Sequence, residues 1–527
     1  MPQGAESLLR TLAAHGVEVV FGLPGVHNLA VWEALSGSGI RMVGVRHEQT
    51  AVYAADGYAR ATGRLGVAVV TTGPGAANAL AATGEAMASG SPVLVVATDI
   101  PSTLRRPGVY RGVLHETRDQ RAMFEPVTKA ALDVPAAAEL PAYVDRAVLL
   151  ATRGAQGPVY LGVPTDFLTA EVADHPATTT APDRAPVPDL TEALALVENA
   201  ERPLLWVGGG AARAGAGPAL DALNDKLNAP IVTTYGARGI SNHPLAVRGP
   251  VHAPAVGALW DDADLVIAIG TDFDGMMTQN WLQPRPRKLL SVNIDEAELS
   301  KNYPADVAVL GDARDVTAAL ADAVPVKKAA VDVESVNAAV RRFVKEDSPE
   351  AAVFLDAIRD QDATIVADMC IPGYWIGGFH HVREPRGLAY PVGWGTLGFG
   401  FPAAIGAAVH GRSIAVVGDG GFLFACGDLA TLKQENLPLT VVVVDDGGYG
   451  MLRYDQKTAG HTITGVDLTR PDFAKLAESF GVPAVTLDGF DGLADALTTQ
   501  GPNVVVVNAT LEPPVNTSPR WYRKPAN

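Results

Sequence analysis

The chain has 527 residues, of which 48% are hydrophobic, and a chain of this length is expected to form several domains rather than one core. Its formal net charge of −17 argues against nonspecific binding of nucleic acid, which depends on neutralising phosphates with Lys and Arg. With only two cysteines, a disulfide framework is excluded, and a reducing, cytoplasmic compartment is expected.

The first 170 residues alternate apolar, strand-like runs with helical patterns, which favours a parallel sheet covered by helices. The opening segment carries Glu6 and lacks the basic flank and unbroken apolar core of a signal peptide. No apolar run in the chain approaches the ~20 residues of a membrane span, so no membrane association is expected. The expected strands lie in "VEVVFGLPG", "MVGVRHE", "GVAVVTTGPG", "PVLVVATD" and "GPVYLGVPTDFL".

Two further blocks of the same kind follow a Pro-, Thr- and Ala-rich segment at 169–190, which predicts a linker. The second block is expected over 188–325, with strands in "RPLLWVGGG", "APIVTTYG", "ADLVIAIGTD" and "KLLSVNID". The third is expected over 345–510, with strands in "ATIVADM", "SIAVVGDGG", "LTVVVVDDGG" and "NVVVVNAT", and the Pro-rich residues 511–527 are interpreted as a tail. The predicted fold class is therefore α/β, with three doubly wound parallel-sheet domains.

Carboxylates stand at two strand ends of the third block. Asp419 follows one buried strand, and Asp446 follows the next, 27 residues further on. One intervening helix would bring both to the same rim of the sheet, where ligands of such sheets bind. Carboxylate and carbonyl oxygens there could hold Mg²⁺ together with ligand phosphates, and a helix beginning at Tyr449 would direct N–H groups at the same anion. A lone Asp–Gly pair after a strand would more often be a plain turn. Two such pairs at neighbouring strand ends favour a site for a chelated diphosphate.

Taken together, these motifs resemble those of the thiamine diphosphate-dependent family of acetolactate synthases and 2-oxo acid decarboxylases. The resemblance covers nearly the whole chain and lies in "FGLPG", "RHEQTAVYAADGYAR", "TTGPGAAN", "GWGTLGFGFPAAIGA" and "GDGGF". It implies a pyrimidine-binding domain at 1–170, a middle domain at 188–325 and a diphosphate-binding domain at 345–510. It further implies thiamine diphosphate and Mg²⁺ as cofactors, and a homodimer or homotetramer whose active site is shared between subunits.

The resemblance also assigns residues to the cofactor site. The metal would be held by Asp419, Asp446 and the Gly448 carbonyl, and the role of Asp445, where the family usually has asparagine, stays open. Leu397 would be the bulky residue beneath the bent cofactor. The other residues expected at the cofactor are Pro24, Gly25, Glu48, Thr72, Gly73, Asn78, Gly395, Gly418, Gly420, Gly421, Tyr449, Gly450 and Met451.

Glu48 follows a strand and opens an Ala-rich helix, so its carboxylate is expected to be shielded from water. Taken alone, a glutamate at a helix start more often stabilises the helix dipole. The resemblance matches Glu48 to the catalytic glutamate that bonds to the pyrimidine ring and promotes proton removal from the thiazolium carbon. A poorly solvated carboxylate is suited to sharing that proton near neutral pH.

Departures from the acetolactate synthase pattern favour a non-oxidative decarboxylase of a 2-oxo acid. Met276 stands where acetolactate synthases have an acceptor-binding arginine, and Asp455 stands close to the position of their tryptophan. Asp455 and Glu116 at the expected substrate end would suit a cationic side chain, as in a guanidino oxo acid, although either could be a solvated surface acid. The alternative is an acetolactate synthase-like carboligase that joins two 2-oxo acids.

His27, His115 and Gln120 are further candidates for catalytic or substrate-contacting residues, although a histidine directly after "FGLPGV" could also be structural. In the middle block, Gly208 and Gly210 suggest a dinucleotide turn whose third glycine is replaced by Arg213, so FAD there is left as an open alternative. The alternative of a nicotinamide dehydrogenase rests only on the sheet pattern and on this broken turn. Another alternative is a protein that binds the cofactor without catalysing a reaction. Glu48 argues against it, because such a protein would have no need of this residue.

Overall fold

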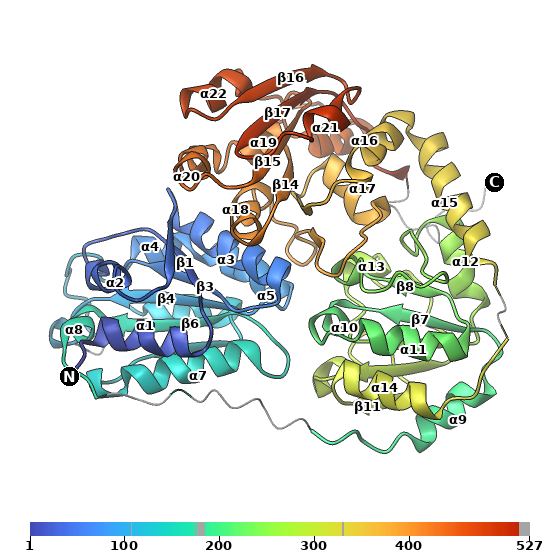
Figure 1. Ribbon diagram of the computed structural model, residues 1–527, viewed down its shortest axis with the longest axis horizontal. Helices are drawn as coiled ribbons and strands as arrows, with labels where there is room; N and C mark the ends of the chain where they lie inside the picture. Colours follow the sequence, from blue (N-terminus) through green and yellow to red (C-terminus); the bar gives the residue numbers. More distant parts are fainter. Residues whose placement is uncertain (107, 174–176, 178–184, 329–330, 516–527) are drawn as a thin grey trace.

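The computed structural model describes residues 1–106, 108–173, 177, 185–328 and 331–515, and these form three α/β domains (Figure 1). The first domain is drawn in blue to cyan and the middle domain in green to yellow, and the third, in orange to red, lies above both. Each domain contains one sheet whose neighbouring strands are parallel. The predicted fold class is confirmed.

The first domain has a sheet of six strands in the order β2-β1-β3-β4-β6-β5. Its central strands are buried along their whole length, because they are apolar at nearly every position and helices cover both faces. The strands are β1 (Val19–Gly22), β2 (Arg41–Gly44), β3 (Gly66–Val70), β4 (Val93–Asp99), β5 (Ala130–Asp133) and β6 (Val159–Pro164). The helices are α1 (Gly4–Ala14), α2 (Leu29–Leu35), α3 (Glu48–Thr62), α4 (Pro74–Asn78), α5 (Leu80–Ala88), α6 (Gln120–Phe124), α7 (Leu140–Thr152) and α8 (Thr165–Thr169).

The middle domain has a sheet of five strands in the order β11-β10-β9-β7-β8. The strands are β7 (Pro203–Val207), β8 (Ile231–Thr233), β9 (Leu265–Ile269), β10 (Leu289–Asn293) and β11 (Val307–Leu310). The helices are α9 (Thr191–Asn199), α10 (Gly209–Arg213), α11 (Gly217–Leu227), α12 (Pro254–Asp262), α13 (Gly275–Thr278) and α14 (Ala313–Ala323). Helix α15 (Val333–Asp347) follows and packs Val333 and Val340 against this domain and Val344 against the third.

The third domain repeats the six-stranded arrangement in the order β13-β12-β14-β15-β17-β16. The strands are β12 (Thr364–Ala367), β13 (Leu388–Ala389), β14 (Ser413–Gly418), β15 (Leu439–Asp445), β16 (Ala484–Asp488) and β17 (Asn503–Asn508). The helices are α16 (Pro349–Arg359), α17 (Ile371–Phe379), α18 (Gly400–His410), α19 (Asp419–Phe422), α20 (Leu429–Gln434), α21 (Gly450–Thr458), α22 (Phe473–Ser479) and α23 (Leu493–Ala496).

The first and third domains share one hydrophobic core, because α3 and α18 cross in direct backbone contact. A Cβ atom on Gly57 would lie 1.9 Å from the Ala403 carbonyl oxygen, and one on Gly406 would lie 1.8 Å from the Ala54 carbonyl oxygen. Only glycine fits at these two positions. The contact joins the domain that carries Glu48 to the domain that carries Asp419.

Two predicted segments, the linker and the tail, lie partly outside the described residues. Of the linker at 169–190, residues 174–176 and 178–184 are outside, as are residues 516–527 of the tail. The described start of the tail packs on the third domain: Leu511 is buried, and Trp375 Nε1 donates to the Glu512 carbonyl over 2.9 Å.

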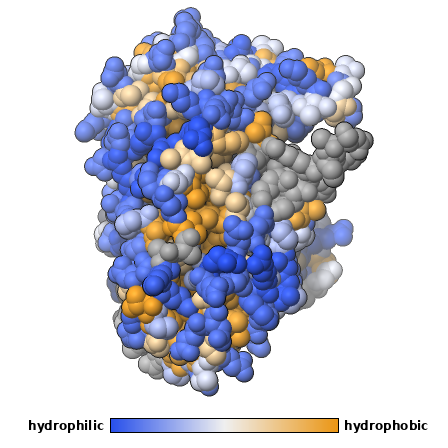
Figure 2. Space-filling view, turned by 90° about the vertical axis from the view of Figure 1, so that its right-hand side faces the viewer, coloured by the Kyte–Doolittle hydropathy of each residue, from blue (hydrophilic) through white to orange (hydrophobic). Residues whose placement is uncertain are grey.

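The outer surface is largely hydrophilic on the side formed by the middle and third domains, with a hydrophobic area near its centre (Figure 2). Within the part of the chain that the structure describes, every helix falls short of the length and apolarity that crossing a membrane requires.

Candidate functional site

Acidic side chains gather at the carboxyl edge of the third sheet. The strand order reverses between β12 and β14, which lie side by side with β15 next to them. Asp368 directly follows β12, Asp419 follows β14, and Asp446 follows β15. A reversal of strand order opens a crevice at this edge, which is where ligands of doubly wound sheets bind.

Asp419 and Asp446 have buried carboxylate oxygens with no hydrogen-bond partner. Asp419 is 1% exposed, and neither of its oxygens accepts a hydrogen bond; the same holds for Oδ1 of Asp446. Burial, followed by the charges of Asp446 and Asp445, raises the pKa of Asp419 to about 7. Burial is also the main cause that raises the pKa of Asp446. Acids whose buried oxygens accept no hydrogen bond are suited to a divalent cation.

The protein supplies only part of a coordination shell at this position. Among the described residues, no group of three or more His, Cys, Asp or Glu side chains could hold a metal ion. Two carboxylates and the Gly448 carbonyl would therefore need oxygens from water or from a bound phosphate. Mg²⁺ commonly binds in this incomplete way at phosphate sites.

Asp445, whose role the sequence left open, pairs with Arg470 and accepts a hydrogen bond from Gly447 N over 3.3 Å. Its charge is thus partly compensated within the protein. Arg453 Nη1 lies 3.7 Å from Asp446 Oδ1, at the far limit of an ion pair. Asp419 is the acid of this group with neither carboxylate oxygen bonded.

The loop between β15 and α21 can be formed only with glycines at two positions. Gly448 has φ +147°, and a Cβ atom there would lie 2.0 Å from the Val466 carbonyl oxygen. A Cβ atom on Gly450 would lie 2.0 Å from Asp446 Oδ2. Tyr449 is the N-cap of α21, which begins at Gly450 rather than at Tyr449 as predicted. The other predicted residues of this edge lie close by: Gly418 ends β14, Gly420 and Gly421 lie in α19, and the half-buried Met451 lies in α21.

Asp368 is a residue of this edge that the sequence analysis missed. It is fully buried and accepts hydrogen bonds from the backbone N–H groups of Met369, Gly398 and Phe399, and burial raises its pKa to about 6. These bonds hold the turn that carries Leu397. An aspartate directly after the apolar run "TIVA" is the same signal that identified Asp419 and could have identified Asp368.

Leu397, the predicted bulky residue, lies beside α19. Its Cδ1 atom is 3.1 Å from the position of a Cβ atom on Gly421, and the side chain is half-buried. Gly395 precedes it in the same turn with φ +67°. Leu397 therefore stands at the edge that carries Asp419.

The residues predicted at the pyrimidine end gather at the corresponding edge of the first sheet, where the strand order reverses between β1 and β3. Pro24 and Gly25 follow β1, and Thr72 and Gly73 follow β3. The two loops touch, because a Cβ atom on Gly25 would lie 2.5 Å from Thr71 Oγ1.

Glu48 lies in the same region as the first residue of α3. It is 6% exposed, and Asn78 Nδ2 donates to its Oε2 over 3.0 Å. Its Oε1 lies 3.0 Å from the position of a Cβ atom on Gly75. The shielding expected from the sequence is observed, and the structure brings Glu48 and Asn78 together. No hydrogen bond or ion pair of the described part of the chain joins this pair to Asp419 or Asp446.

His27 and His115 face each other at the rim of the first domain. Their Nδ1 atoms are 3.3 Å apart, and burial, followed by the charge of His115, lowers the pKa of His27. His115 has φ +66°, and its carbonyl oxygen lies 2.3 Å from the position of a Cβ atom on Gly73. The two histidines thus lie against the loop that carries Thr72 and Gly73.

Gln120 is buried, and both the oxygen and the nitrogen of its side-chain amide form hydrogen bonds within the protein. Its Oε1 accepts from Gly73 N over 2.7 Å, while its Nε2 donates to the Thr98 carbonyl and to Tyr160 Oη, each over 2.9 Å. Gln120 therefore holds the Gly73 loop in position.

The glycine turn of the middle domain has a packing explanation. Gly210 N donates to the Gly270 carbonyl over 2.9 Å, and a Cβ atom on Gly208 would lie 2.3 Å from the same oxygen. Arg213 reaches from α10 to the first domain, where its Nη1 donates to the Ser89 carbonyl over 3.0 Å. The two glycines are therefore explained by close packing against the backbone at Gly270, without a bound dinucleotide.

The residues predicted near the substrate differ in their surroundings. Glu116 accepts the backbone N–H groups of Arg111 and Val113, so its carboxylate stabilises its own loop. Asp455 is exposed on α21, and none of the ion pairs in the described part of the chain involves it. Met276 lies in α13 and is 48% exposed. Asp455 is the acid of this set that is available to a ligand.

Comparison with known proteins matches three family models in the order of the three domains. These are the N-terminal TPP binding domain of thiamine pyrophosphate enzymes over residues 2–123, their central domain over 190–320 and their C-terminal TPP binding domain over 370–508. The chain is 37% identical to a probable 2-ketoarginine decarboxylase of Pseudomonas aeruginosa, over 90% of this chain and 88% of that protein.

Two further relatives carry a different name. The chain is 32% identical to a probable acetolactate synthase large subunit of Methanocaldococcus jannaschii, over 94% of this chain and 89% of that protein. It is 34% identical to an acetolactate synthase large subunit of Parasynechococcus marenigrum, over 96% of this chain and 87% of that protein.

Proposed function

Because this chain belongs to the thiamine pyrophosphate enzyme family, we propose that it is a Mg²⁺-dependent decarboxylase of a 2-oxo acid with a cationic side chain. The observation that carries the cofactor assignment is the set of free, buried carboxylate oxygens of Asp419 and Asp446. A metal-bound diphosphate would satisfy them. When bound, thiamine diphosphate supplies the nucleophilic carbon and the electron sink for loss of carbon dioxide.

Each half of the site has a distinct task in this proposal. Asp419, Asp446 and the Gly448 carbonyl would hold the metal, and the backbone N–H groups at the start of α21 would be available to the diphosphate. Glu48 would share a proton with the pyrimidine end, and the bond from Asn78 Nδ2 fixes one of its oxygens in place. Leu397 lies beside Gly421 and would limit the space there.

The cationic substrate is supported by one relative and one side chain. The relative from Pseudomonas aeruginosa is named as acting on 2-ketoarginine, which carries a guanidinium group. Asp455 lies on the helix that begins beside the metal site, and its exposed carboxylate could pair with such a group. An apolar Met276 at the position of the acceptor-binding arginine also favours decarboxylation without a second oxo acid.

Carboligation to an acetohydroxy acid is the second candidate. Relatives named as acetolactate synthases align over 94% or more of this chain, so the overall architecture serves either outcome. The two outcomes differ in whether a proton or a second oxo acid takes up the carbon that has lost carbon dioxide.

A homo-oligomer with a shared site is part of the proposal, and exposed apolar side chains support it. Several flank the loops of the pyrimidine end, where a second subunit could cover them. They are Val26, Leu29, Val109, Tyr110 and Leu114, each more than half exposed. The two cysteines are free, which suits the proposed cytoplasmic location.

The experiment that tests this function is a substrate panel with added thiamine diphosphate and Mg²⁺. Purified protein is given 5-guanidino-2-oxopentanoate, pyruvate, and 2-oxohexanoate, whose side chain is uncharged. Carbon dioxide is measured, and the products are identified by mass spectrometry. We expect kcat/KM to be highest for the guanidino acid, by about tenfold or more over 2-oxohexanoate, the effect of one charge-assisted contact. The aldehyde should be the product.

Omitting the cofactor or chelating the metal should abolish turnover of every substrate in the panel. Consumption of pyruvate alone, with acetolactate as the product, would select the carboligase instead. Full activity after removal of both thiamine diphosphate and divalent metal would reject the cofactor assignment.

A further inference from the structure

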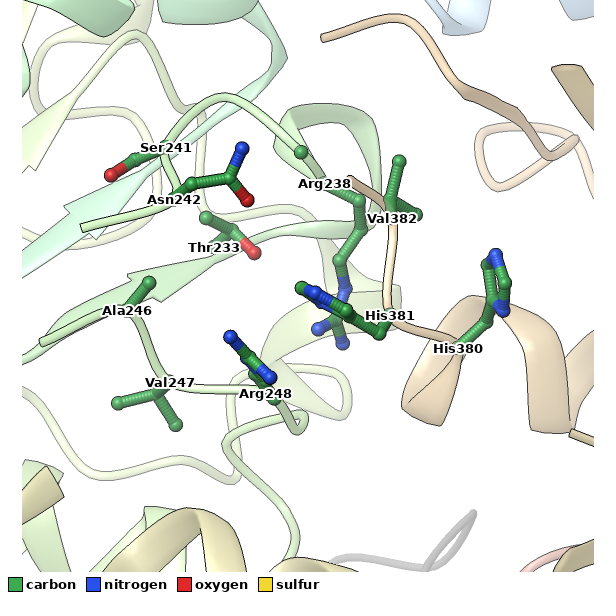
Figure 3. Close-up of a pocket in the computed structure, with 11 residues that line it drawn as sticks. Thr233, Arg238, Ser241, Asn242, Ala246, Val247, Arg248, His380, His381 and Val382 are labelled. Carbon is green, nitrogen blue, oxygen red and sulfur yellow. The ribbon is translucent and has the colours of Figure 1, made fainter. Parts of the chain in front are cut away.

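A pocket that is lined by none of the candidate active-site residues lies between the middle and third domains (Figure 3). It is a partly open hollow with about 410 Å³ of space between its side chains and the solvent in front of them. We call it the Arg238 pocket. Among its lining residues are Thr233, Arg238, Asn242, Arg248, His380 and His381. The middle domain supplies the first four, and the segment after α17 supplies the two histidines.

Cationic and hydrogen-bond-donating side chains dominate this pocket. Figure 3 shows the side chains of Arg238, Arg248 and His381 converging at its centre. Nearby positive charges contribute to lowering the pKa of His381 to about 4, after burial: Arg248, Arg383, Arg359 and Arg238. The same burial and a similar set of cations lower the pKa of His380 to about 4. No carboxylate stands among the groups that shift either ring.

Arg238 has an unused donor in a buried position. It is 8% exposed, and its Nη2 donates to the Gly378 carbonyl over 2.7 Å, whereas its Nε has no partner. A buried guanidinium without a carboxylate partner is costly, because both its charge and its donor lose water. An anion in the pocket would offset the cost of the buried charge.

We propose that the Arg238 pocket binds a small oxyanion of the phosphoryl class. The guanidinium groups of Arg238 and Arg248 would donate charge-assisted hydrogen bonds to it, and the Asn242 and Thr233 side chains line the same space. This site is independent of the proposed function, because none of its lining residues belongs to the candidate active site. It does not include the Gly208–Gly210 turn of the same domain either.

The position of the pocket relates it to the catalytic half of the third domain. His380 is the C-cap of α17, and Cys370 is the N-cap of the same helix. A Cβ atom on Gly418 would lie 3.4 Å from Cys370 Cβ, so the other end of α17 touches the strand that leads to Asp419. An anion held beside His380, at the carboxyl end of α17, would thus fix a helix whose other end lies next to the proposed metal site.

The source of the phosphoryl group is either free phosphate or the end of a nucleotide, and titration of the full-length protein distinguishes them. Inorganic phosphate, AMP and ADP are each titrated by calorimetry, with chloride keeping the ionic strength constant. We expect saturable binding of phosphate. Comparable affinity for all three assigns free phosphate, and much tighter binding of AMP or ADP assigns a nucleotide end. Absence of saturable binding for all three overturns the proposal.

Variants test whether binding occurs in this pocket. Arg248→Gln, at an exposed residue that should not affect folding, is expected to weaken phosphate binding by about tenfold or more, the effect of losing one charge-assisted hydrogen bond. Arg238→Lys keeps the charge but loses the planar guanidinium group, and it should also weaken binding. Arg285→Gln removes an exposed arginine of the same domain and should leave binding unchanged. Unchanged affinity in Arg248→Gln, or an equal loss in Arg285→Gln, contradicts the assignment.

Discussion

Glu48 and Asp419 are both carboxylates at the first position of a helix that follows a strand, yet their surroundings prepare them for different tasks. Glu48 accepts a bond from the neutral Asn78 amide and has no acid beside it among its described contacts. Asp419 has two acids near it and no donor for its carboxylate. A carboxylate with a neutral donor is suited to sharing a proton, whereas one facing other acids requires a cation.

Replacing Glu48 with glutamine tests the proton-sharing task. Glu48→Gln preserves the size of the side chain and can still bond to Asn78, so thiamine diphosphate should bind with nearly unchanged affinity. Turnover should fall by about two orders of magnitude or more, the usual size of general acid–base catalysis. Calorimetric binding and steady-state decarboxylation provide the two measurements.

The matched control for this substitution is Glu192→Gln, at an exposed residue of α9 in the middle domain. It should leave turnover and cofactor binding as they are. If Glu48→Gln retained full activity, Glu48 would have no part in the mechanism.

At the scale of the elements, the crossing of α3 and α18 decides how the two cofactor-binding domains meet. Both helices consist largely of alanine and glycine, and they are buried on nearly every side. The helix backbones touch at Gly57 and Gly406, so neither helix can shift without opening the shared core. Glu48 stands at the first residue of one of these helices.

Gly406→Ala should therefore be destabilising, although alanine is the better helix former. The added methyl group would lie 1.8 Å from the Ala54 carbonyl oxygen, which is backbone and cannot move alone. We expect a loss of about 1–3 kcal/mol in the free energy of unfolding, the usual cost of overpacking. Denaturant unfolding followed by circular dichroism measures it.

Gly411→Ala, directly after the end of α18, is the control, because nothing lies within 4 Å of a Cβ atom there. Its stability should remain close to that of the parent protein. Equal stability of Gly406→Ala and the parent would show that the two helices are not in the close contact described.

The strands that the sequence analysis missed share one position in the fold. They are β5, β11, β13 and β16, and each lies at the edge of its sheet. All four are partly exposed, whereas the central strands are buried along nearly their whole length and were recognised. The other two edge strands, β2 and β8, were also recognised.

At the scale of the whole molecule, one buried arginine connects the first and third domains. Arg60 bonds to both carboxylate oxygens of Asp56 and to Glu85, and its Nη1 donates to the Tyr390 carbonyl of the third domain over 2.9 Å. Glu85 also accepts from Thr396 Oγ1 over 2.8 Å, next to Leu397. This network ties the turn beside the proposed metal site to the domain of Glu48.

Arg60→Met should break the connection and leave two acids buried without a cation. Removing one partner of a buried charge network usually costs about 3–5 kcal/mol, so we expect a clear fall in Tm by calorimetry. The first and third domains should also unfold less cooperatively, because their shared contact is weakened.

Arg64→Met is the control for Arg60→Met, because Arg64 forms an exposed ion pair with Glu18 just beyond the end of α3. Such a pair contributes at most about 1 kcal/mol, so little change in Tm is expected. Similar small effects of both substitutions would mean that the Arg60 network does not hold the domains together.

The sequence by itself determined the α/β class, the membership of the thiamine pyrophosphate enzyme family and the strand ends that carry Glu48, Asp419 and Asp446. These features depend on local apolar runs and on motifs of adjacent residues, which can be read along the chain. Only the tertiary structure decided that Asp368 holds the Leu397 turn, that Arg470 pairs with Asp445, and that the Arg238 pocket joins two domains. These features depend on residues that are distant in sequence, and no local pattern specifies which of them will meet.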